Sequence, residues 1–394
     1  MSAAQWRKAM NSGAQAQAWP RQRRIASAAA GPAPIAGLPG DSDAPAWLQW
    51  VWQRVSARHV IVMLAVLVYP WVATPFFTFQ IGGQSLALGL IALSLTFLAG
   101  YGGMVSLAQM TVAGIAGYAV AIFGTSSMAE ISLGWPWWLV VGIAVAIATV
   151  CATFIGWLSV RTEGIYTIMI TLAIGMAFYY LTVQNYSVLN GWQGFQRVLA
   201  PTVAGLELRS PVPFYYLALF WALAGYFFVK YLVRTPFGIA LQGIRDNARR
   251  MDALGFNVTA HRIAAYAVAG LIAAVGGVLM TWYNGLVTPG SVGVSGLINI
   301  LIIAVLGGMR HPIGPFLGAI VFVLLQNFAI DVFDRERFNL VIGAMFLAIV
   351  LFSPDGLLGL WARLRARLEG ADAQSRISTR GASRRPLAKG GTSP

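Results

Sequence analysis

PFGIALQGIRDNARRMDALGF, residues 236–256, is a charged amphipathic stretch between two apolar segments, 213–233 and 263–283, that are each long enough to cross a membrane. Thr235 suits the N-cap of a helix, Pro236 its first position, and Gly255 the residue that ends it. Between them, apolar residues recur at helical spacing on one face and charged residues fall on the other. The stretch therefore predicts a short helix that joins two spans without entering the bilayer.

The two faces of this predicted helix suggest two different roles. The apolar face consists of Leu241, Ile244, Ala248, Met251 and Leu254. The polar face consists of Gln242, Arg245, Asp246, Arg249 and Asp252. Asp246 and Arg250 have the i, i+4 spacing of a helical ion pair. Such a helix either docks on a partner protein or lies among lipid headgroups with its apolar face toward the bilayer, and the pattern alone leaves both open.

The composition of the whole chain indicates an all-α polytopic membrane protein. Of its 394 residues, 58% are hydrophobic and only 10% are charged, and the mean hydropathy is +0.68. Windows of sufficient length and apolarity predict about ten transmembrane helices. These windows are 60–80, 83–100, 104–126, 137–159, 164–183, 213–233, 263–283, 296–309, 312–331 and 338–353.

The net charge of +14 is explained by membrane topology and does not indicate nucleic acid as a partner. When the N-terminus is placed inside and ten spans alternate, 23 of the 27 basic residues fall on the inner side. The positive-inside rule accounts for this asymmetry. The chain is therefore expected to be a multi-pass membrane protein with both termini in the cytoplasm.

The two ends of the chain differ from its middle. Residues 1–57 are rich in Ala, Gly, Pro, Gln and Arg, and are expected to be a disordered cytoplasmic extension, or the product of a start site placed too far upstream. Residues 58–360 are expected to form the transmembrane domain. Residues 361–394 are basic and of low complexity, and are expected to be a disordered cytoplasmic tail whose arginines are able to contact anionic lipid.

The sequence offers no residues for catalysis or for a cofactor. Cys151 is the one cysteine and lies within a predicted span, which excludes disulfides and a thiolate metal site. No glycine-rich run ends in Gly-Lys-Ser or Gly-Lys-Thr, so no phosphate-binding loop for ATP is present. No Asp, Glu, Lys or Arg lies deep within a predicted span, whereas ion-coupled carriers usually need such groups or unwound helices near the midplane. The chain is therefore not expected to be an enzyme, nor to drive transport alone.

Two glycine-rich segments of similar pattern stand out among the spans, AGYGGMVSLAQMTVAGIAGYA (99–119) and VLGGMRHPIGPFLGA (305–319). Each predicts a helix, a Gly-Gly turn and a second helix with small residues at packing spacing, and their likeness suggests an internal repeat. Either the glycines only allow close packing, or the two bent hairpins line a transport path. The candidate path residues are Gly100, Gly102, Gly103, Ser106, Gln109, Gly307, Gly308, Gly314 and Gly318.

Over about residues 60–360 the chain resembles the permease subunits of branched-chain amino-acid ABC importers, and specifically the second of their two permease types. The resemblance is carried by GYGGMVSLAQ (100–109), RTEGIYTIMITLA (161–173), RTPFGIALQGIRDNARRMDALGFNV (234–258) and VLGGMRHPIGPFLGA (305–319), followed by LFSPDGLLGL (351–360). The chain departs from the family in having Ala108 and Gln109 where Gly-His or Gly-Gln is common. If that position lines the path, the preference among substrates is expected to differ.

The resemblance implies a role for the 236–256 helix. In this family the matching helix couples the permease to a cytoplasmic ATPase. The positions that match are Arg245, Asp246, Asn247, Arg249, Met251, Asp252 and Gly255. Of the apolar face, Met251 and Leu254 are expected to be the anchors in the ATPase groove. The resemblance thus favours docking on a protein over anchoring in lipid.

The function that the resemblance implies is import of branched-chain or related amino acids by alternating access, with ATP hydrolysed on separate subunits. The implied partners are a second permease, two ATPase subunits and a periplasmic substrate-binding protein. Importers of urea, amides or organic acids remain alternatives, as does a self-sufficient secondary carrier. A membrane receptor or scaffold without transport is a third, and the glycine hairpins argue against it.

Overall fold

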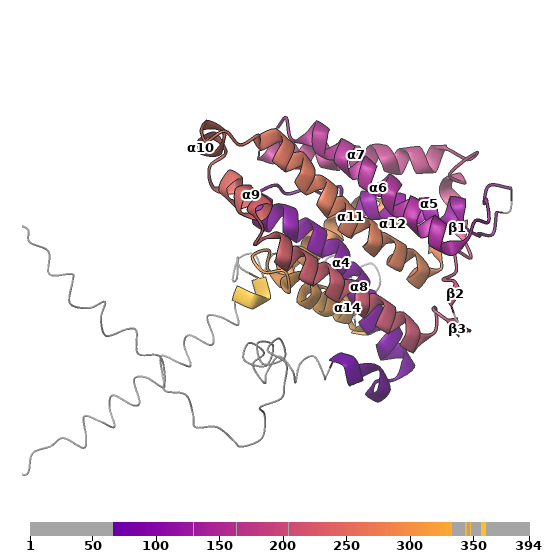
Figure 1. The fold of residues 1–394 in the computed structure, drawn as a ribbon. Coiled ribbons are helices and arrows are strands. Elements are labelled where there is room, and N and C mark those ends of the chain that lie inside the picture. Colours follow the sequence, from indigo (N-terminus) through magenta and orange to yellow (C-terminus); the bar gives the residue numbers. More distant parts are fainter. Residues whose placement is uncertain are drawn as a thin grey trace, which may run out of the picture. The chain divides into compact units, whose positions relative to one another are not determined.

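The computed structural model describes residues 66–128, 130–162, 164–203, 205–332, 343–344, 347 and 356–359. The elements below all belong to the unit Leu67–Pro394 (Figure 1). The expected extension 1–57 and tail 361–394 lie outside the described residues.

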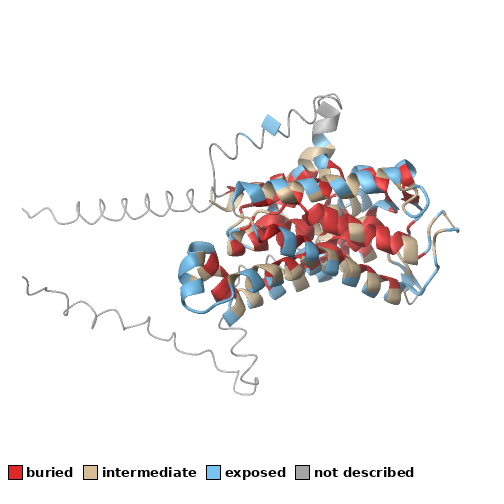
Figure 2. Ribbon diagram, turned by 90° about the horizontal axis from the view of Figure 1, so that it is seen from above, coloured by how far each residue is buried: buried red, intermediate tan, exposed pale blue. Residues whose placement is uncertain are grey.

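Two long helical runs form the centre of this unit. The first consists of the π-helix η1 (Phe77–Gly83), α4 (Gln84–Thr96) and the π-helix η2 (Phe97–Tyr101). The second is α11 (Val258–Asn284), which packs along α4, α5 (Gln109–Phe123) and α6 (Trp137–Ser159). The apolar window of the first run is 83% buried inside the protein, and Figure 2 shows buried residues concentrated along these inner helices. They are therefore the core on which the other helices pack.

Small residues allow α6 to lie close to α11. Ala144, Ala148 and Ala152 recur every four residues along α6 and are fully buried. A Cβ added to Gly270 of α11 would collide with the Cβ of Ala152. Without a hydrophobic driving force between helices in lipid, such close backbone approach is a main source of association.

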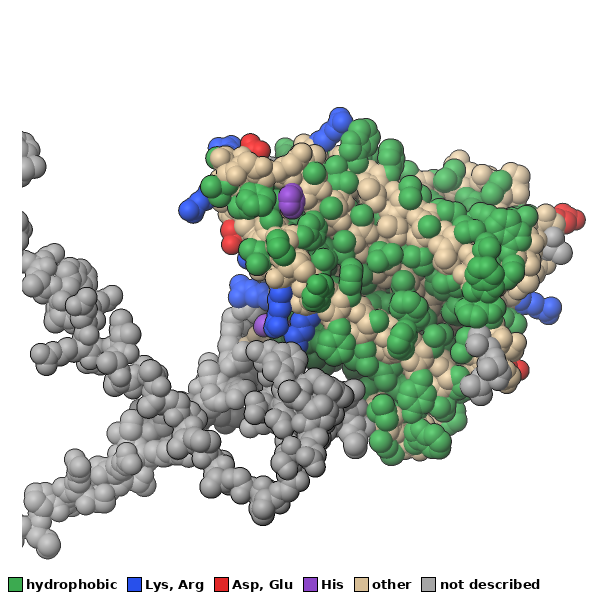
Figure 3. All heavy atoms as spheres, in the orientation of Figure 1, with side chains coloured by type: hydrophobic (Ala, Val, Ile, Leu, Met, Phe, Trp, Pro, Cys, Tyr) green, Lys and Arg blue, Asp and Glu red, His purple; other side chains and the backbone are tan. Residues whose placement is uncertain are grey.

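Two helices lie at the edge of the unit and expose apolar surface. These are α7 (Ile165–Gln184) and α8 (Pro211–Leu232), whose apolar windows are only 22% and 33% buried. Apolar side chains cover most of the face seen in Figure 3, whereas charged side chains gather at its two ends. This distribution is that of an integral membrane protein, whose apolar band faces lipid.

The prediction of about ten spans is not confirmed. Among the described residues, five helices are long and apolar enough to cross a membrane, and three more apolar helices are shorter, Gln109–Phe123, Val294–Gly307 and Gly314–Phe328. The predicted windows 60–80 and 338–353 lie partly or mostly outside the described residues. The predicted window 104–126 gives a shorter helix because Gly103 turns the chain with φ +68° and the helix begins only at Gln109.

The remaining elements sit at the ends of the long helices. At one end, α9 (Pro236–Asp246) and α10 (Ala248–Ala253) connect α8 to α11. At the other end, β2 (Thr202–Val203) pairs with β3 (Leu206–Glu207), and β1 (Phe195–Gln196) pairs with β4 (Leu286–Val287), both antiparallel (Figure 1). The turn η3 (Gly191–Gln193) precedes β1, and β4 leads into α12 (Pro289–Val292), α13 (Val294–Gly307) and α14 (Gly314–Val332), which packs on α4.

Candidate functional site

The candidate site is the end of the unit where α9 and α10 meet the two glycine-rich segments. α9 is held there by its apolar face, because Leu241 and Ile244 are almost fully buried. Its first turn is closed as predicted, with the Thr235 side chain accepting a hydrogen bond from the Gly238 amide and Pro236 at the first helical position.

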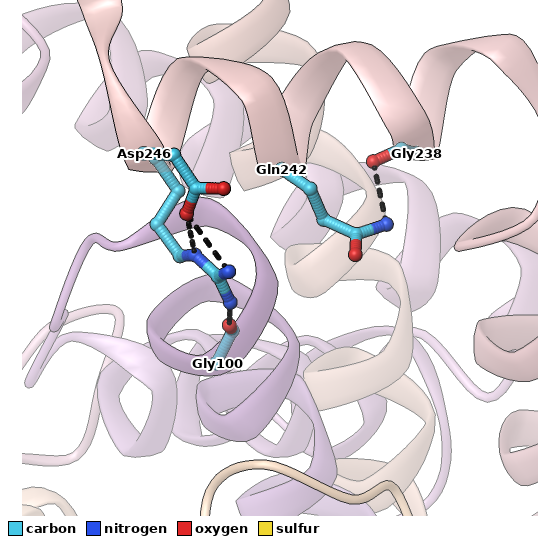
Figure 4. A network of polar contacts seen from close by, with 5 residues as sticks. Gly100, Gly238, Gln242 and Asp246 are labelled. Carbon is cyan, nitrogen blue, oxygen red and sulfur yellow. Dashed lines mark hydrogen bonds and ion pairs between the residues drawn. The ribbon is translucent and has the colours of Figure 1, made fainter. Parts of the chain in front are cut away.

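A polar side chain also fixes the corner between α8 and α9. The amide nitrogen of Gln242 donates to the carbonyl of Gly238 at 3.1 Å and to that of Val233 at 3.2 Å (Figure 4). Val233 ends α8, so this contact satisfies a carbonyl that has no partner within its own helix. The corner is therefore rigid on both its apolar and its polar side.

The stretch 236–256 forms two helices, not the single helix that its periodicity predicts. Asn247 has extended backbone angles, φ −159° and ψ 95°, which end α9. Its side chain accepts a hydrogen bond of 2.9 Å from the Arg250 amide and so begins α10. Asparagine competes for backbone groups in this way, which makes it a good cap and a poor helix interior. The predicted Asp246–Arg250 pair is wrong for the same reason, because the break separates the two residues, and Asp246 pairs with Arg245 instead at 2.9 Å.

The C-terminal end of α10 is closed by a Schellman motif. Gly255 has φ +89°, the Phe256 amide donates to the Met251 carbonyl at 3.1 Å, and the Gly255 amide donates to the Asp252 carbonyl at 2.9 Å. Gly255 therefore has the capping role predicted for it, at the end of the second helix.

The predicted anchors in this stretch differ in exposure. Met251 folds back on α9, since a Cβ at Gly243 would lie 2.8 Å from its sulfur. Leu254 is 65% exposed, and Arg249 and Asp252 are exposed as well. Only Leu254 of the two predicted anchors is thus free to enter a groove on another protein without rearrangement.

Arg245 is partly exposed, with 39% of its side chain accessible, and its guanidinium contacts the first glycine turn. Its Nη1 donates to the Gly100 carbonyl at 2.6 Å, while its Nε and Nη2 donate to Asp246 at 3.0 and 2.9 Å (Figure 4). A Cβ at Gly103 would lie 2.6 Å from the Arg245 Cγ, so a larger residue there would displace the arginine. Gly100 lies in the last turn of the π-helix η2, where the carbonyls have no partner within the helix.

The two glycine-rich segments meet at the same place. A Cβ at Gly100 would collide with the Met309 carbonyl oxygen, and the Tyr101 hydroxyl donates to the Arg310 carbonyl at 3.5 Å. The second segment is itself a tight helix–turn–helix, because a Cβ at Gly307 would collide with the Gly314 carbonyl oxygen. Gly308, with φ +100°, makes that turn, and Gly318 crosses close to the backbone of Ile303.

Ser106 and Gln109 of the first segment are completely buried in the protein. Gln109, at the start of α5, accepts a 3.0 Å hydrogen bond from the Ser94 hydroxyl on α4. The non-helical residues before α5 are held by Thr171 of α7, whose hydroxyl accepts from the Leu107 amide at 3.1 Å. Irregular backbone at membrane depth is stable only when protein or water satisfies it. In this structure these residues hold α4, α5 and α7 together.

The sequence reasoning missed the residues that receive these contacts. Ser94 and Thr171 are polar residues within largely apolar windows, a signal that they share with neighbours such as Thr96 and Thr167. No sequence pattern indicates the role of Met309, because its backbone carbonyl, and not its side chain, makes the contact with Gly100. Among the described residues, no group of three or more His, Cys, Asp or Glu is placed to hold a metal ion.

Comparison with known proteins gives one family and several distant relatives. A family described as the permease component of branched-chain amino acid transport systems matches residues 77–350. The chain is 25% identical to the high-affinity branched-chain amino acid transport system permease protein LivM of Escherichia coli (strain K12), over 77% of this chain and 75% of that protein. It is 26% identical to LivH of the same strain, over 68% of this chain and 90% of that protein.

A relative with a different named substrate also matches. The ribose import permease protein RbsC of Haemophilus influenzae is 22% identical, over 70% of this chain and 84% of that protein. No solved structure matches the chain significantly.

Proposed function

The chain belongs to the family of permease components of branched-chain amino acid transport systems, and we propose that it is a membrane subunit of an ATP-driven importer of branched-chain or related amino acids. It would work with a second permease, two ATPase subunits and a periplasmic binding protein in a bacterial inner membrane. Similarity to both LivM and LivH supports pairing of two related permeases. Transport would proceed by alternating access, with ATP hydrolysed on the ATPase subunits.

The observation that carries this proposal is the α9–α10 element between two candidate spans. It is anchored to the core through Leu241 and Ile244 but presents exposed Leu254, Arg249 and Asp252 outward. A surface that combines an apolar residue with charges of both signs suits docking on a protein, in which charges fix orientation and apolar contacts supply affinity. We assign it as the ATPase-docking element, on the cytoplasmic side.

Arg245 would transmit movement from this element into the membrane domain. It joins α9 to the Gly100 carbonyl at the end of η2, and η2 continues directly into the central α4 run. Gly100 also lies against the backbone of Met309, between α13 and α14. A push on α9 would therefore reach both glycine-rich segments, which are candidates for the moving parts of the path.

The distribution of charged residues supports an importer whose energy comes from separate ATPase subunits. In the five described candidate spans, Lys, Arg, Asp and Glu occur only near the helix ends, as Lys230 in α8 and Arg262 in α11. Carriers driven by proton or sodium gradients usually place such groups near the midplane. A self-sufficient secondary carrier is thus the weaker proposal.

The substrate is proposed from the family alone. The matching ribose import permease favours keeping non-amino-acid substrates as a second candidate, together with urea, amides and organic acids. Ligand binding by the cognate periplasmic protein would decide among them.

The docking proposal is tested by reversing the charge of Asp246, whose carboxylate is exposed. Asp246→Arg would place a third positive charge beside Arg245 and Arg249, and like charges at an interface cost several kcal/mol. Recovery of the ATPases with the purified permease should fall about tenfold or more. Glu207→Arg, a charge reversal in β3 at the other end of the unit, is the matched control.

The opposite outcome has a clear meaning. An extra arginine would strengthen contact of an interfacial helix with anionic lipid. Unchanged ATPase recovery and unchanged uptake by Asp246→Arg would therefore make α9–α10 a lipid anchor and remove the docking proposal.

A further inference from the structure

A crevice opens between α5, α6 and α7, away from the candidate site. It has a volume of about 380 Å³, and its walls are apolar. Its lining includes Ile115 of α5, Cys151, Phe154 and Ile155 of α6, and Ile174 and Phe178 of α7. The crevice exists because α6 packs mainly against α11 and α5, and only lightly against α7.

The mouth of the crevice lies on the lipid-facing surface. Val150 and Phe154, on one face of α6, are 68% and 61% exposed, and both line the crevice. α6 is a candidate membrane span of high hydropathy. An exposed apolar side chain in the middle of such a span faces hydrocarbon, so the crevice opens sideways into the bilayer.

The lining restricts the chemistry of an occupant. A zwitterionic amino acid would lose its hydration without gaining a charged or polar partner, which costs several kcal/mol. A water molecule needs two to four polar partners, and the one hydroxyl in the lining, that of Thr111, is fully buried. A hydrocarbon chain needs no polar partner, and lipid chains are abundant at the mouth of the crevice.

A charged residue lies in the turn that follows α6. Phe154 stacks on Trp157 with ring centroids 5.8 Å apart, and the Arg161 guanidinium lies over the Trp157 ring at 4.6 Å. From Phe154 to the end of α6 at Ser159 is about 7.5 Å along the helix, and Arg161 follows two residues later. Tryptophan favours the headgroup level of a bilayer, and arginine binds phosphate oxygens in a bidentate manner.

We propose that this crevice is a phospholipid site, in which one acyl chain lies between α6 and α7 and an anionic headgroup contacts Arg161. Arg161 begins the stretch RTEG (161–164), which belongs neither to the proposed docking element nor to the two glycine-rich segments. The proposal requires only that the protein spans a membrane and does not depend on the transport function.

Photo-crosslinking with the purified full-length protein tests the site. The probes are phosphatidylglycerol and phosphatidylcholine that carry the same diazirine in the middle of one acyl chain. Phosphatidylglycerol should label peptides around Cys151–Phe154 and Ile174 about fivefold more than phosphatidylcholine does, which is the preference that one arginine near a membrane surface supplies.

Two variants separate the headgroup contact from the crevice. Arg161→Gln should remove the preference for phosphatidylglycerol, whereas Arg209→Gln, at an exposed arginine outside the crevice, should keep it. Ile174→Trp should fill the crevice and abolish labelling there with both lipids, whereas Leu223→Trp on the outer surface of α8 should not. Retained helical circular dichroism and a single gel-filtration peak establish that each variant is folded.

Two results would overturn the proposal. Equal labelling by the two lipids, unchanged in Arg161→Gln, would mean general solvation of the surface without a headgroup site. Labelling that is spread evenly over α6, α7 and α8, and is insensitive to Ile174→Trp, would mean that no chain enters the crevice.

Discussion

The Nη1 of Arg245 lies 2.6 Å from the Gly100 carbonyl oxygen, although the two residues are 145 positions apart in the sequence. This contact joins the amphipathic helix α9 to a π-helical end of the central run. On the proposed function, the exposed residues of α10 would bind the ATPase, and the Arg245–Gly100 contact would carry the resulting movement into the membrane domain.

We predict that Arg245→Gln reduces ATP-driven uptake more than ATPase binding. A hydrogen bond from a charged group contributes about 1.5–3 kcal/mol, so uptake should fall about tenfold or more while ATPase recovery changes little. Arg234→Gln, at an exposed arginine of the same end, is the control. Parallel loss of recovery and uptake would instead place Arg245 in the docking surface.

Asn247→Ala should loosen α10 without affecting α9. Loss of an N-cap costs about 1 kcal/mol, so amide hydrogen exchange in 248–253 should become about fivefold faster, with no change in 236–246. Asn247→Asp keeps an acceptor at the cap and should exchange as the parent does. If the alanine variant exchanges no faster, the cap is not what starts α10.

Gly270→Ala should destabilise the contact between α6 and α11. The added methyl group meets Ala152, and overpacking of this kind costs about 1–3 kcal/mol. Because a loss of about 1 kcal/mol of stability lowers an unfolding temperature by several degrees, the unfolding temperature in detergent should drop by at least that much. Gly142 lies on α6 and has no atom near an added Cβ, so Gly142→Ala should leave the unfolding temperature unchanged or raise it. Equal unfolding temperatures for the two variants would contradict the close approach.

The orientation of the chain is tested by labelling from outside intact cells. In a Cys151→Ala background, Glu207→Cys in β3 should react with a membrane-impermeant maleimide, because α8 separates it from α9. Arg249→Cys in α10 should be protected until the membrane is opened. External labelling at position 249 would reverse the topology and exclude cytoplasmic docking there.

Much of the fold follows from patterns within single elements. The windows 137–159 and 164–183 match α6 (Trp137–Ser159) and α7 (Ile165–Gln184) closely, because an apolar helix bounded by turn residues depends on its own sequence. The caps at Thr235 and Gly255 were predictable for the same reason. Local chemistry decided these features, so the sequence contained enough to find them.

The features that the sequence did not reveal depend on distant residues or on competition between local preferences. The apolar period continues through Asn247, but the side chain of that residue caps the next helix and breaks the pattern. Arg245 was predicted to face a partner, and its contact with Gly100 became visible only when α9 and η2 were placed side by side. The burial of Gln109 depends likewise on Ser94, from another helix.

The break at Asn247 also distributes stiffness unevenly along the docking element. α9 is held to the core by Leu241, Ile244 and Arg245, whereas α10 has no buried residue and is joined to α9 by the extended residue Asn247 and by contact of Met251 with Gly243. A stiff base with a compliant tip adapts to small differences in the shape of the surface it meets while still passing on force. On the proposed function, the permease would therefore tolerate small differences in the ATPase surface without any change in its membrane domain.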